Sequence, residues 1–330
     1  MPKVSLIIPT LNRKTLLTEC LRSIFDQAYR DFEVIIVDGG STDGTNELAR
    51  LFSIKFLRQE GRFQPSGENL GITCSNGEIL AFVDDDVIAG KDWLGHIVQT
   101  FDDKRVGGVG GRVIQPDLVT NGRFKPNLTG YTSLRNRIFA SLCENRLGET
   151  GQILRSGYVT PNLDRVTRTC IEVHTFQGCN MAFRREVFET VGLFDESYMP
   201  SPFRFETEFC LRALSRGFRL LYNPEAVVYH QSHKSHYSRP QGSTLGRSLF
   251  YNSINSFLFV VRGRRQIPRF SWPRFVLVQL LAGEECLRLA LRRRTIAYLL
   301  GPWGTIVAFR RWISNYDAAR RGHIPTLHAD

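Results

Sequence analysis

The segment GEILAFVDDDV, from Gly77 to Val87, places three consecutive carboxylates directly after a run of apolar residues. A short, uninterrupted apolar run is typical of a strand that is buried on both faces of a parallel sheet. Adjacent like charges repel one another, so a row of aspartates at the end of such a strand needs a cation or a ligand to offset the repulsion. The segment therefore predicts a buried strand that leads into a binding site.

Strand and helix patterns alternate over the first hundred residues. Apolar runs at residues 4–9 and 33–38 predict two further strands, and another strand is expected at residues 54–59. Residues 13–29 place apolar side chains at helical spacing. Continuous apolar strands joined by helices form a parallel sheet that is covered on both faces. We therefore expect an α/β fold. Further helices of this unit are predicted at residues 46–52, 69–75 and 91–101.

The alternation stops between residue 111 and about residue 175, a stretch rich in Gly, Pro, Asn and Arg. Only residues 133–147 have a helical pattern there, and a segment of this kind is typical of a lid or a variable insertion. Regular patterns return after it, with a helix predicted at residues 205–217 and a strand at residues 218–230. From residue 236 onward the chain consists of long, basic, apolar helical segments.

The positive charge of the chain lies almost entirely in its last hundred residues. The 330 residues have a net charge of +11, and residues 231–330 hold 16 Lys and Arg against 4 Asp and Glu, a net charge of +12. The other 230 residues hold 27 basic and 28 acidic residues and are close to neutral. A near-neutral body with a basic tail indicates an anionic partner, either a phospholipid surface or a nucleic acid.

The seven cysteines and the hydropathy pattern indicate the cellular compartment of the protein. The number of cysteines is odd, and no pair has the C-x-x-C spacing. This favours reduced thiols over a disulfide framework or a zinc site. No signal peptide is predicted, and no run reaches the ~18 to 20 apolar residues that span a bilayer, because Gly301 and Pro302 interrupt the longest candidate. We therefore expect a cytoplasmic protein.

Several acidic residues fall at the carboxyl ends of predicted strands. Asp38 ends the second strand, Asp43 opens the following helix, and Asp84 to Asp86 end the fourth strand. Ligands of open α/β sheets bind beyond these strand ends. Carboxylate oxygens there suit Mg²⁺ or Mn²⁺ carrying a phosphate-bearing substrate. A solvated acidic turn that caps a helix is the alternative interpretation of the three aspartates.

Six motifs occur in an order that points to one enzyme family. They read VSLIIPTLNR, VIIVDGGSTDGT, GEILAFVDDDV, QGCNMAFRREVF, GLFDESY and ETEFCLRALSRGFRLLYNPEAVVYH. Together they resemble the inverting glycosyltransferases of family 2, which have the GT-A fold. The resemblance extends over roughly residues 3–235. It implies transfer of a sugar from a nucleotide-sugar donor, with a UDP-sugar expected, to a hydroxyl group of a glycan or a lipid-linked acceptor.

The resemblance also assigns the donor and metal residues. Asp84 and Asp86 match the Asp-x-Asp motif, with Asp86 as the direct ligand of Mn²⁺ or Mg²⁺, and His230 is implied to join the metal site. Glu68 stands where the family usually has an arginine, so Arg62 is expected to supply a positive charge to the diphosphate. The implied donor-binding residues are Pro9, Thr10, Asn12, Asp38, Arg62, Asn69, Asp84 and Asp85.

The catalytic base is expected within FETEFCLR. By the spacing to Arg212, Glu206 falls on the carboxylate position of the family motif, and Glu208 is the second candidate. Acids on the first turn of a helix can equally serve to complement the helix dipole. The motif QGCNMAFRRE resembles the segment beneath the acceptor sugar, which implies acceptor contacts from Gly178 and Asn180. The alternative for this motif is a tight strand start.

These patterns divide the chain into a glycosyltransferase domain at residues 1–235 and a basic helical region at residues 236–330. Apolar helix faces rimmed by arginines favour peripheral contact with the cytoplasmic face of a membrane. The aromatic residues of the tail are interleaved with aliphatic ones, which argues against nucleic acid. Two other functions stay open. A nucleotidyltransferase would need a glycine-rich phosphate loop, and a catalytically inactive relative would explain Gly39, Glu68 and Phe205 at motif positions.

Overall fold

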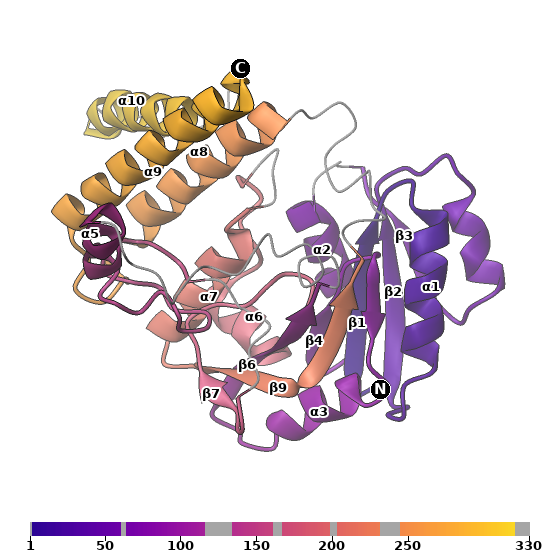
Figure 1. Cartoon of the computed structure of the whole chain (residues 1–330). Helices are drawn as coiled ribbons and strands as arrows, with labels where there is room; N and C mark the ends of the chain where they lie inside the picture. Colours follow the sequence, from indigo (N-terminus) through magenta and orange to yellow (C-terminus); the bar gives the residue numbers. More distant parts are fainter. Residues whose placement is uncertain are drawn as a thin grey trace.

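The computed structural model describes residues 2–60, 64–115, 134–160, 167–198, 203–231 and 245–320, with the side chains of Arg135 and of residues 311–320 excepted. A twisted sheet forms the centre of the molecule, and three long C-terminal helices lie beside the end toward which β4 and β9 point (Figure 1).

The N-terminal part follows the predicted alternation of strands and helices. Its strand β1 pairs in parallel with β2 and β4, and β2 pairs in parallel with β3. Helix α1 packs Leu17, Cys20, Leu21 and Ile24 on the sheet, which is the apolar stripe that its sequence predicts. The elements are β1 (Val4–Thr10), α1 (Lys14–Phe25), β2 (Phe32–Asp38), the 3₁₀ helix η1 (Thr45–Arg50), β3 (Lys55–Arg58), α2 (Gln64–Thr73), β4 (Ile79–Phe82), β5 (Val87–Ala89) and α3 (Trp93–Thr100).

The second part of the chain completes the same sheet. Strand β8 runs antiparallel to both β4 and β6, while β6 and β9 are parallel. Strands β5 and β7 pair with β9 in the antiparallel sense. These elements are β6 (Val106–Ile114), α5 (Leu134–Leu142), β7 (Ile171–Glu172), β8 (Met181–Arg184), α6 (Arg185–Val191), α7 (Phe205–Ser215) and β9 (Arg219–His230).

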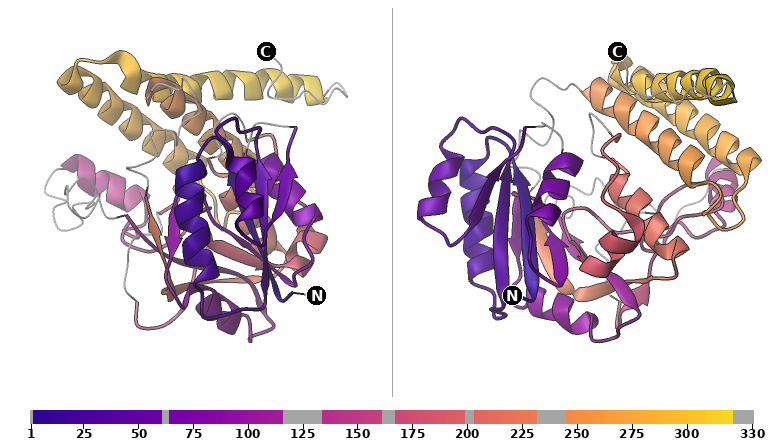
Figure 2. Two further views of the ribbon diagram at one scale, coloured as in Figure 1. Left: turned by 90° about the vertical axis from the view of Figure 1, so that its right-hand side faces the viewer. Right: turned by 180° about the vertical axis from the view of Figure 1, so that it is seen from behind.

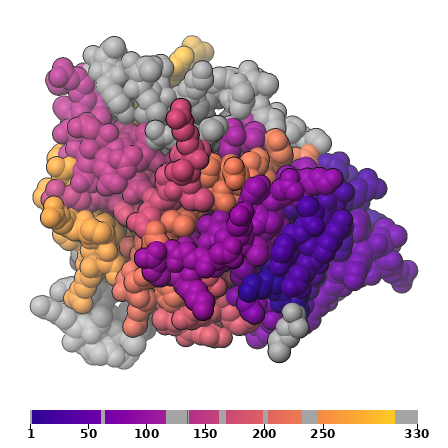
Figure 3. Space-filling model, turned by 90° about the horizontal axis from the view of Figure 1, so that it is seen from below, coloured from indigo at the N-terminus to yellow at the C-terminus, as the bar shows by residue number. Residues whose placement is uncertain are grey.

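The sheet order is β3-β2-β1-β4-β8-β6-β9-β5, with β7 beside β9. Strands β1, β2, β3, β4, β6 and β9 point one way, and β5, β7 and β8 point the other way. The expected α/β fold with a mostly parallel sheet is therefore confirmed. Seen from below, the N-terminal and later segments form one continuous surface (Figure 3).

Two apolar cores cover the two faces of the sheet. Successive residues of β1 alternate between them: Leu6 and Ile8 join the core under α1 and α3, and Ile7 joins the core under α6 and α7. Alternation of this kind requires strands that are apolar at every position, which explains the uninterrupted apolar runs of the sequence. Because both faces are buried, the carboxyl ends of the parallel strands are where polar groups of the sheet meet solvent.

The C-terminal helices extend one of these cores. Phe257 and Val261 of the first tail helix lie in the core that also contains Phe209 of α7. The two helices approach so closely that a Cβ added at Gly263 would lie 2.6 Å from Cδ2 of Leu211. Figure 2 shows this helix against the body of the molecule, with the other tail helices farther out. The tail elements are α8 (Leu245–Gly263), α9 (Trp272–Arg293), the 3₁₀ helix η2 (Ile296–Leu299) and α10 (Leu300–Arg320).

The predicted domain boundary near residue 235 stays a prediction.

Gly301 and Pro302, which interrupt the apolar run of the sequence, lie in the first turn of α10. Proline is tolerated there because the N–H groups of the first turn have no acceptor within the helix. Among the described helices, none offers an apolar stretch long enough to cross a bilayer.

Strand β6 is rich in glycine because neighbouring groups occupy the space of its side chains. A Cβ at Gly111 would lie 2.0 Å from the carbonyl oxygen of Ala226, a backbone atom that cannot move aside. We predict that Gly111→Ala lowers the free energy of unfolding by about 3 kcal/mol or more, because the contact overpacks β6 against β9. Urea unfolding followed by circular dichroism measures this change.

Gly95 is the matched control for this substitution. A Cβ at this position in α3 would meet no atom within 4 Å. Gly95→Ala should leave stability unchanged or raise it by up to about 1 kcal/mol, through helix propensity. Equal stability of the two variants would contradict the packing of β6 against β9 described above.

Candidate active site

The three aspartates of the opening motif lie between β4 and β5, where the chain turns away from the sheet. Strand β4 ends at Phe82, and Asp85 and Asp86 lie in the turn that follows. The side chains of Asp85 and Asp86 are 4% and 2% exposed, whereas that of Asp84 is 31% exposed. The interpretation as a fully solvated acidic turn is therefore wrong, because two of the three carboxylates are buried.

Asp85 is held by the loop that follows β1. Its Oδ2 accepts a hydrogen bond of 2.7 Å from Oγ1 of Thr10, and its Oδ1 accepts one of 2.6 Å from Nη1 of Arg13. Burial raises the pKa of Asp85 to about 6, against the opposing effect of Arg13 and Thr10. Both oxygens thus face protein groups, so this carboxylate fixes the two strand ends relative to each other.

Asp84 and Asp86 both face His230 at the end of β9. Nε2 of His230 lies 3.1 Å from Oδ1 of Asp86 and 3.7 Å from Oδ2 of Asp84. Burial alone would lower the pKa of His230, but its hydrogen bonds to Asp84 and Asp86 outweigh burial and raise it to about 10. In the absence of a metal ion, the imidazolium therefore serves as the counter-charge of the two carboxylates.

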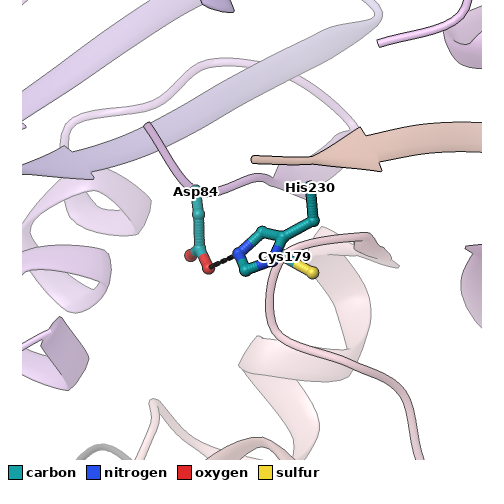
Figure 4. Close-up of side chains that lie close together, drawn as sticks. All are labelled: Asp84, Cys179 and His230. Carbon is teal, nitrogen blue, oxygen red and sulfur yellow. Dashed lines mark ion pairs between the residues drawn. The ribbon is translucent and has the colours of Figure 1, made fainter. Parts of the chain in front are cut away.

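A cysteine completes this cluster. One ligand atom each of Asp84, Cys179 and His230 lies within 4.8 Å of the others. Figure 4 shows the three side chains converging from the β4–β5 turn, the loop before β8 and the end of β9. Burial raises the pKa of the Cys179 thiol well above its ordinary value, and the charges of Asp84 and Asp86 raise it further.

The donor set fits a divalent cation. Carboxylate oxygens and a histidine nitrogen from separate elements converge on one point, and such groups ligate Mn²⁺ and related ions. A cation would replace the proton of His230 and provide the positive charge that the imidazolium now provides.

Glu206 and Glu208 lie on the first turn of α7 and have different surroundings. Both oxygens of Glu208 accept hydrogen bonds from Arg212, at 2.8 and 2.9 Å. Oε2 of Glu206 is buried and has no hydrogen-bond partner within the described ranges. Burial raises the pKa of Glu206 to about 7, with Asp84 adding to the rise. Glu208 is therefore held by an arginine, whereas Glu206 has a carboxylate oxygen without a hydrogen bond within the described ranges. Glu206 is also the glutamate of the two whose pKa the charge of Asp84 raises.

Glu68 lies on α2, buried beside the same cluster. Nε2 of Gln64 donates to Oε1 of Glu68 at 2.9 Å and to Oδ1 of Asp84 at 3.3 Å. Burial raises the pKa of Glu68 well above its ordinary value, and the charges of Asp84 and Glu206 raise it further. A protonated Glu68 would not repel a diphosphate. Arg62, expected to supply the positive charge here, lies outside the described residues.

The other expected donor residues connect loops at the carboxyl ends of β1 and β2. Both oxygens of Asp38 accept bonds from the backbone N–H groups of residues 40 and 41, at 3.0 to 3.2 Å. Oδ1 of Asn12 accepts from N–H of Thr42 at 2.8 Å. Pro9 lies beside Thr10 in β1, which pairs with β2. The structure thus brings these residues to the same edge as the aspartates.

Asn69 has its contacts on the other side of α2. Its Nδ2 donates to the carbonyl of Phe194 at 3.0 Å and to Oε1 of Glu196 at 2.8 Å, and its Oδ1 accepts from N–H of Phe194 at 3.0 Å. These bonds tie α2 to the segment between α6 and α7.

Gly178 and Asn180, the expected acceptor residues, flank Cys179. A Cβ at Gly178 would meet nothing within 4 Å, so the space beside it is open. Asn180 is fully buried, with Nδ2 donating to the carbonyls of Arg112 and Ala226 and Oδ1 accepting from Nε1 of Trp93. The amide of Asn180 therefore holds the loop before β8 in place, and of the two residues only Gly178 has open space beside it.

Three residues of the site were not singled out from the sequence. Arg13 provides the positive charge against Asp85 and Asp86, at 2.6 and 3.5 Å. A basic residue three positions after a strand that ends at the acidic edge was the available signal for it. Gln64 and Cys179 carried no comparable signal, because nothing in the sequence pairs them with Asp84.

Comparison with known proteins agrees with this arrangement. The family model for Glycosyl transferase family 2 matches residues 5–192, more than half of the chain. The chain belongs to glycosyl transferase family 2. The matched region contains the three aspartates and Cys179.

Individual family 2 relatives match shorter stretches. Glycosyltransferase AglE of Haloferax volcanii is 38% identical over 121 residues, which is 34% of this chain and 40% of AglE. GalNAc(5)-diNAcBac-PP-undecaprenol beta-1,3-glucosyltransferase of Campylobacter jejuni is 39% identical over 93 residues, which is 26% of this chain and 30% of that protein. The chain thus spans less than half of the length of either relative.

Solved structures share the fold over nearly the whole chain. The mannosyltransferase PcManGT from Pyrobaculum calidifontis, in complex with GDP-Man and Mn²⁺, aligns with a TM-score of 0.54 at 20% identity, over 98% of this chain and 77% of that one. S. aureus TarS 1–349 in complex with UDP-GlcNAc aligns with a TM-score of 0.53 at 14% identity, over 94% and 92% of the two chains. At these identities the likeness concerns the fold.

The pairing of Arg13 with buried aspartates can be tested through stability. We predict that Arg13→Ala lowers the free energy of unfolding at pH 7 by about 3 to 5 kcal/mol, because it leaves buried carboxylates without their counter-charge. Chemical denaturation of the purified chain measures the change.

Arg105→Ala is the matched control for this prediction. Arg105 pairs with Asp103 on the surface, where ion pairs contribute little to stability. If both substitutions had the same small effect, Arg13 would not neutralise the buried aspartates.

Proposed function

We propose that this family 2 enzyme transfers a sugar from a nucleoside diphosphate sugar to a hydroxyl group, with inversion at the anomeric carbon and with a divalent cation. The observation that carries the proposal is the convergence of Asp84, Asp86 and His230 beside a buried Glu206. A metal site next to a carboxylate of raised pKa is the combination that this reaction needs.

In this proposal, Asp84, Asp86 and His230 would hold the cation, and a bound cation would supply positive charge to the diphosphate leaving group. Glu206 accepts the proton of the acceptor hydroxyl group. The hydroxyl oxygen then forms a bond to the anomeric carbon, while the bond from this carbon to the diphosphate oxygen breaks on the opposite face. The nucleoside diphosphate leaves with the bonding electrons.

Two solved relatives support a nucleotide-sugar donor, one bound to GDP-Man with Mn²⁺ and one bound to UDP-GlcNAc. The two donors carry different bases, and a UDP-sugar remains our expectation for this chain. The acceptor proposed is a glycan or a lipid-linked glycan, in keeping with the relative named for GalNAc(5)-diNAcBac-PP-undecaprenol.

The assignment of the base is tested by substitution. We predict that Glu206→Gln lowers the turnover number by about 10²- to 10⁴-fold, because the uncharged amide cannot accept the proton. The assay mixes the chain with Mn²⁺ and a panel of UDP- and GDP-sugars and measures the released nucleoside diphosphate.

The pH profile gives a second measure of the same residue. Glu206 acts when ionised, so kcat/KM should rise with pH and level off above about 7, the pKa that burial gives it. With the cation bound, the rise should lie somewhat below this pH, because the cation cancels the charge of Asp84, which adds to the larger effect of burial on the pKa of Glu206. Glu206→Gln should lose the limb altogether.

Glu208→Gln is the control for Glu206→Gln. It should retain most of the activity, because Glu208 is paired with Arg212 and not with the aspartate cluster. If Glu208→Gln were the inactive variant, the roles of the two glutamates would be reversed.

A catalytically inactive protein that binds nucleotide sugars is the second candidate. Glu68, buried where the family usually has an arginine, favours it. Tight binding of nucleoside diphosphates with no product from any donor would select this candidate.

We further propose that the tail contacts an anionic membrane surface. Large apolar side chains of α9 are exposed at helical spacing, including Leu280, Leu287 and Leu291, and Trp303 and Ile306 of α10 are also exposed. Helices that combine exposed apolar residues with arginines bind at the membrane interface.

Arginines 292 to 294 provide the test of this contact. Each arginine near an anionic leaflet contributes about 1 kcal/mol, so exchange of all three for glutamine should weaken binding to anionic vesicles roughly 100-fold. Vesicle flotation without detergent measures the binding.

A triple variant of the body serves as the control for charge. Exchange of the exposed Arg50, Arg105 and Arg216 for glutamine removes the same charge and should leave flotation unchanged. Failure of the natural chain to float with anionic or neutral vesicles would refute membrane contact.

A further inference from the structure

The geometry points to Cys179 as a sulfur ligand of the cation, which makes this a mixed nitrogen, oxygen and sulfur site that favours thiophilic ions such as Co²⁺, Zn²⁺ and Cd²⁺. The inference deepens the proposed function, because it concerns the same cation. It rests on the position of the sulfur, which lies within 4.8 Å of ligand atoms of Asp84 and His230.

The distances between the three ligand atoms are short enough that small side-chain movements would place all three on one ion. Ligand atoms of Asp84, Cys179 and His230 lie within 4.8 Å of one another. With metal–ligand bonds of about 2.0 to 2.3 Å and tetrahedral angles, two donors on one ion lie about 3.3 to 3.8 Å apart. Small rotations of the three side chains drawn in Figure 4 would therefore bring all three ligand atoms onto one ion.

The backbone around Cys179 is fixed by its neighbour. The buried amide of Asn180 bonds to β6, β9 and α3 through Arg112, Ala226 and Trp93. N–H of Asn180 also donates to the carbonyl of Gln177 at 3.0 Å, which closes a turn around Gly178 and Cys179. The backbone next to the sulfur is thus held by bonds that do not involve Asp84, Asp86 or His230, as the surroundings of a preorganised ligand require.

The other cysteines do not share this environment. Cys74, Cys143, Cys170, Cys210 and Cys286 are absent from the group of ligand atoms found within the described ranges. Cys20 lies near the aspartates, but its sulfur faces the backbone carbonyl of Asp84 at 3.7 Å. Cys179 is therefore the cysteine that this geometry selects.

A sulfur donor changes which ion the site prefers. Mg²⁺ takes oxygen ligands almost exclusively, whereas thiolate and imidazole suit Co²⁺, Zn²⁺ and Cd²⁺. On coordination the thiol releases its proton to solvent, and the thiolate donates an electron pair to the cation. The affinity order expected for the natural chain is Cd²⁺ and Zn²⁺ first, then Co²⁺, then Mn²⁺, and last Mg²⁺.

Titration of the full chain with Co²⁺ alone tests the proposal. Binding should produce a thiolate-to-cobalt charge-transfer band in the near ultraviolet together with the visible bands of bound Co²⁺. Cys179→Ser should keep the visible bands and lose the charge-transfer band. Cys74→Ser, a cysteine away from the site, should keep both.

Competition between Cd²⁺ and Mn²⁺ gives an independent readout. Cys179→Ser should weaken Cd²⁺ binding by about 10-fold or more and change Mn²⁺ binding much less, because loss of a ligand affects the softer ion more. Circular dichroism establishes that the variant is folded, and Cys179→Ala provides a second variant if it is not.

The outcomes separate this inference from the proposed function. Visible bands without a charge-transfer band in the natural chain, or a charge-transfer band that persists in Cys179→Ser, would overturn the sulfur ligand and leave the cation site intact. If Co²⁺ and Mn²⁺ both failed to bind, the cation site itself would be refuted, and the sulfur ligand with it.

Discussion

The accumulation of negative charge at the end of β4 is the constraint around which the site is built. Two of its three aspartates are buried, so their charges must be neutralised within the protein or by a ligand. Arg13 and His230 provide that neutralisation from the loop after β1 and from the end of β9. Strands β1, β4 and β9 have their carboxyl ends on the same side of the sheet. Neutralisation of the aspartates therefore depends on this arrangement.

The two counter-charges differ in what can replace them. Arg13 keeps its charge under all conditions and bonds to Asp85, which makes it a permanent part of the structure. A cation that binds the same carboxylates can displace the proton of His230, which then passes to solvent. Asp85 thus stabilises the fold, whereas Asp84 and Asp86 can exchange the charge of His230 for that of a bound cation.

Sequence patterns predicted β1 to β4 and β9, missed β5 to β8, and predicted the contacts of the site only partly. Uninterrupted apolar runs identified β1, β2 and β4, because strands buried on both faces leave no other pattern, whereas β3 lies at the edge of the sheet and is only partly buried. Glu206 and the aspartates came from motifs. The partners of Asp84 and Asp85 did not, since contacts such as Gln64 with Asp84 and Arg13 with Asp85 depend on how separate loops meet. Asn69 and Asn180 illustrate the same limit, because their amides bond to protein groups that are distant in the chain.

The packing of α7 on α8 links the candidate base to the tail. Helix α7 carries Glu206 on its first turn and meets α8 where Gly263 lies against Leu211. A surface that holds the tail would therefore also set the direction from which a hydroxyl group reaches Glu206.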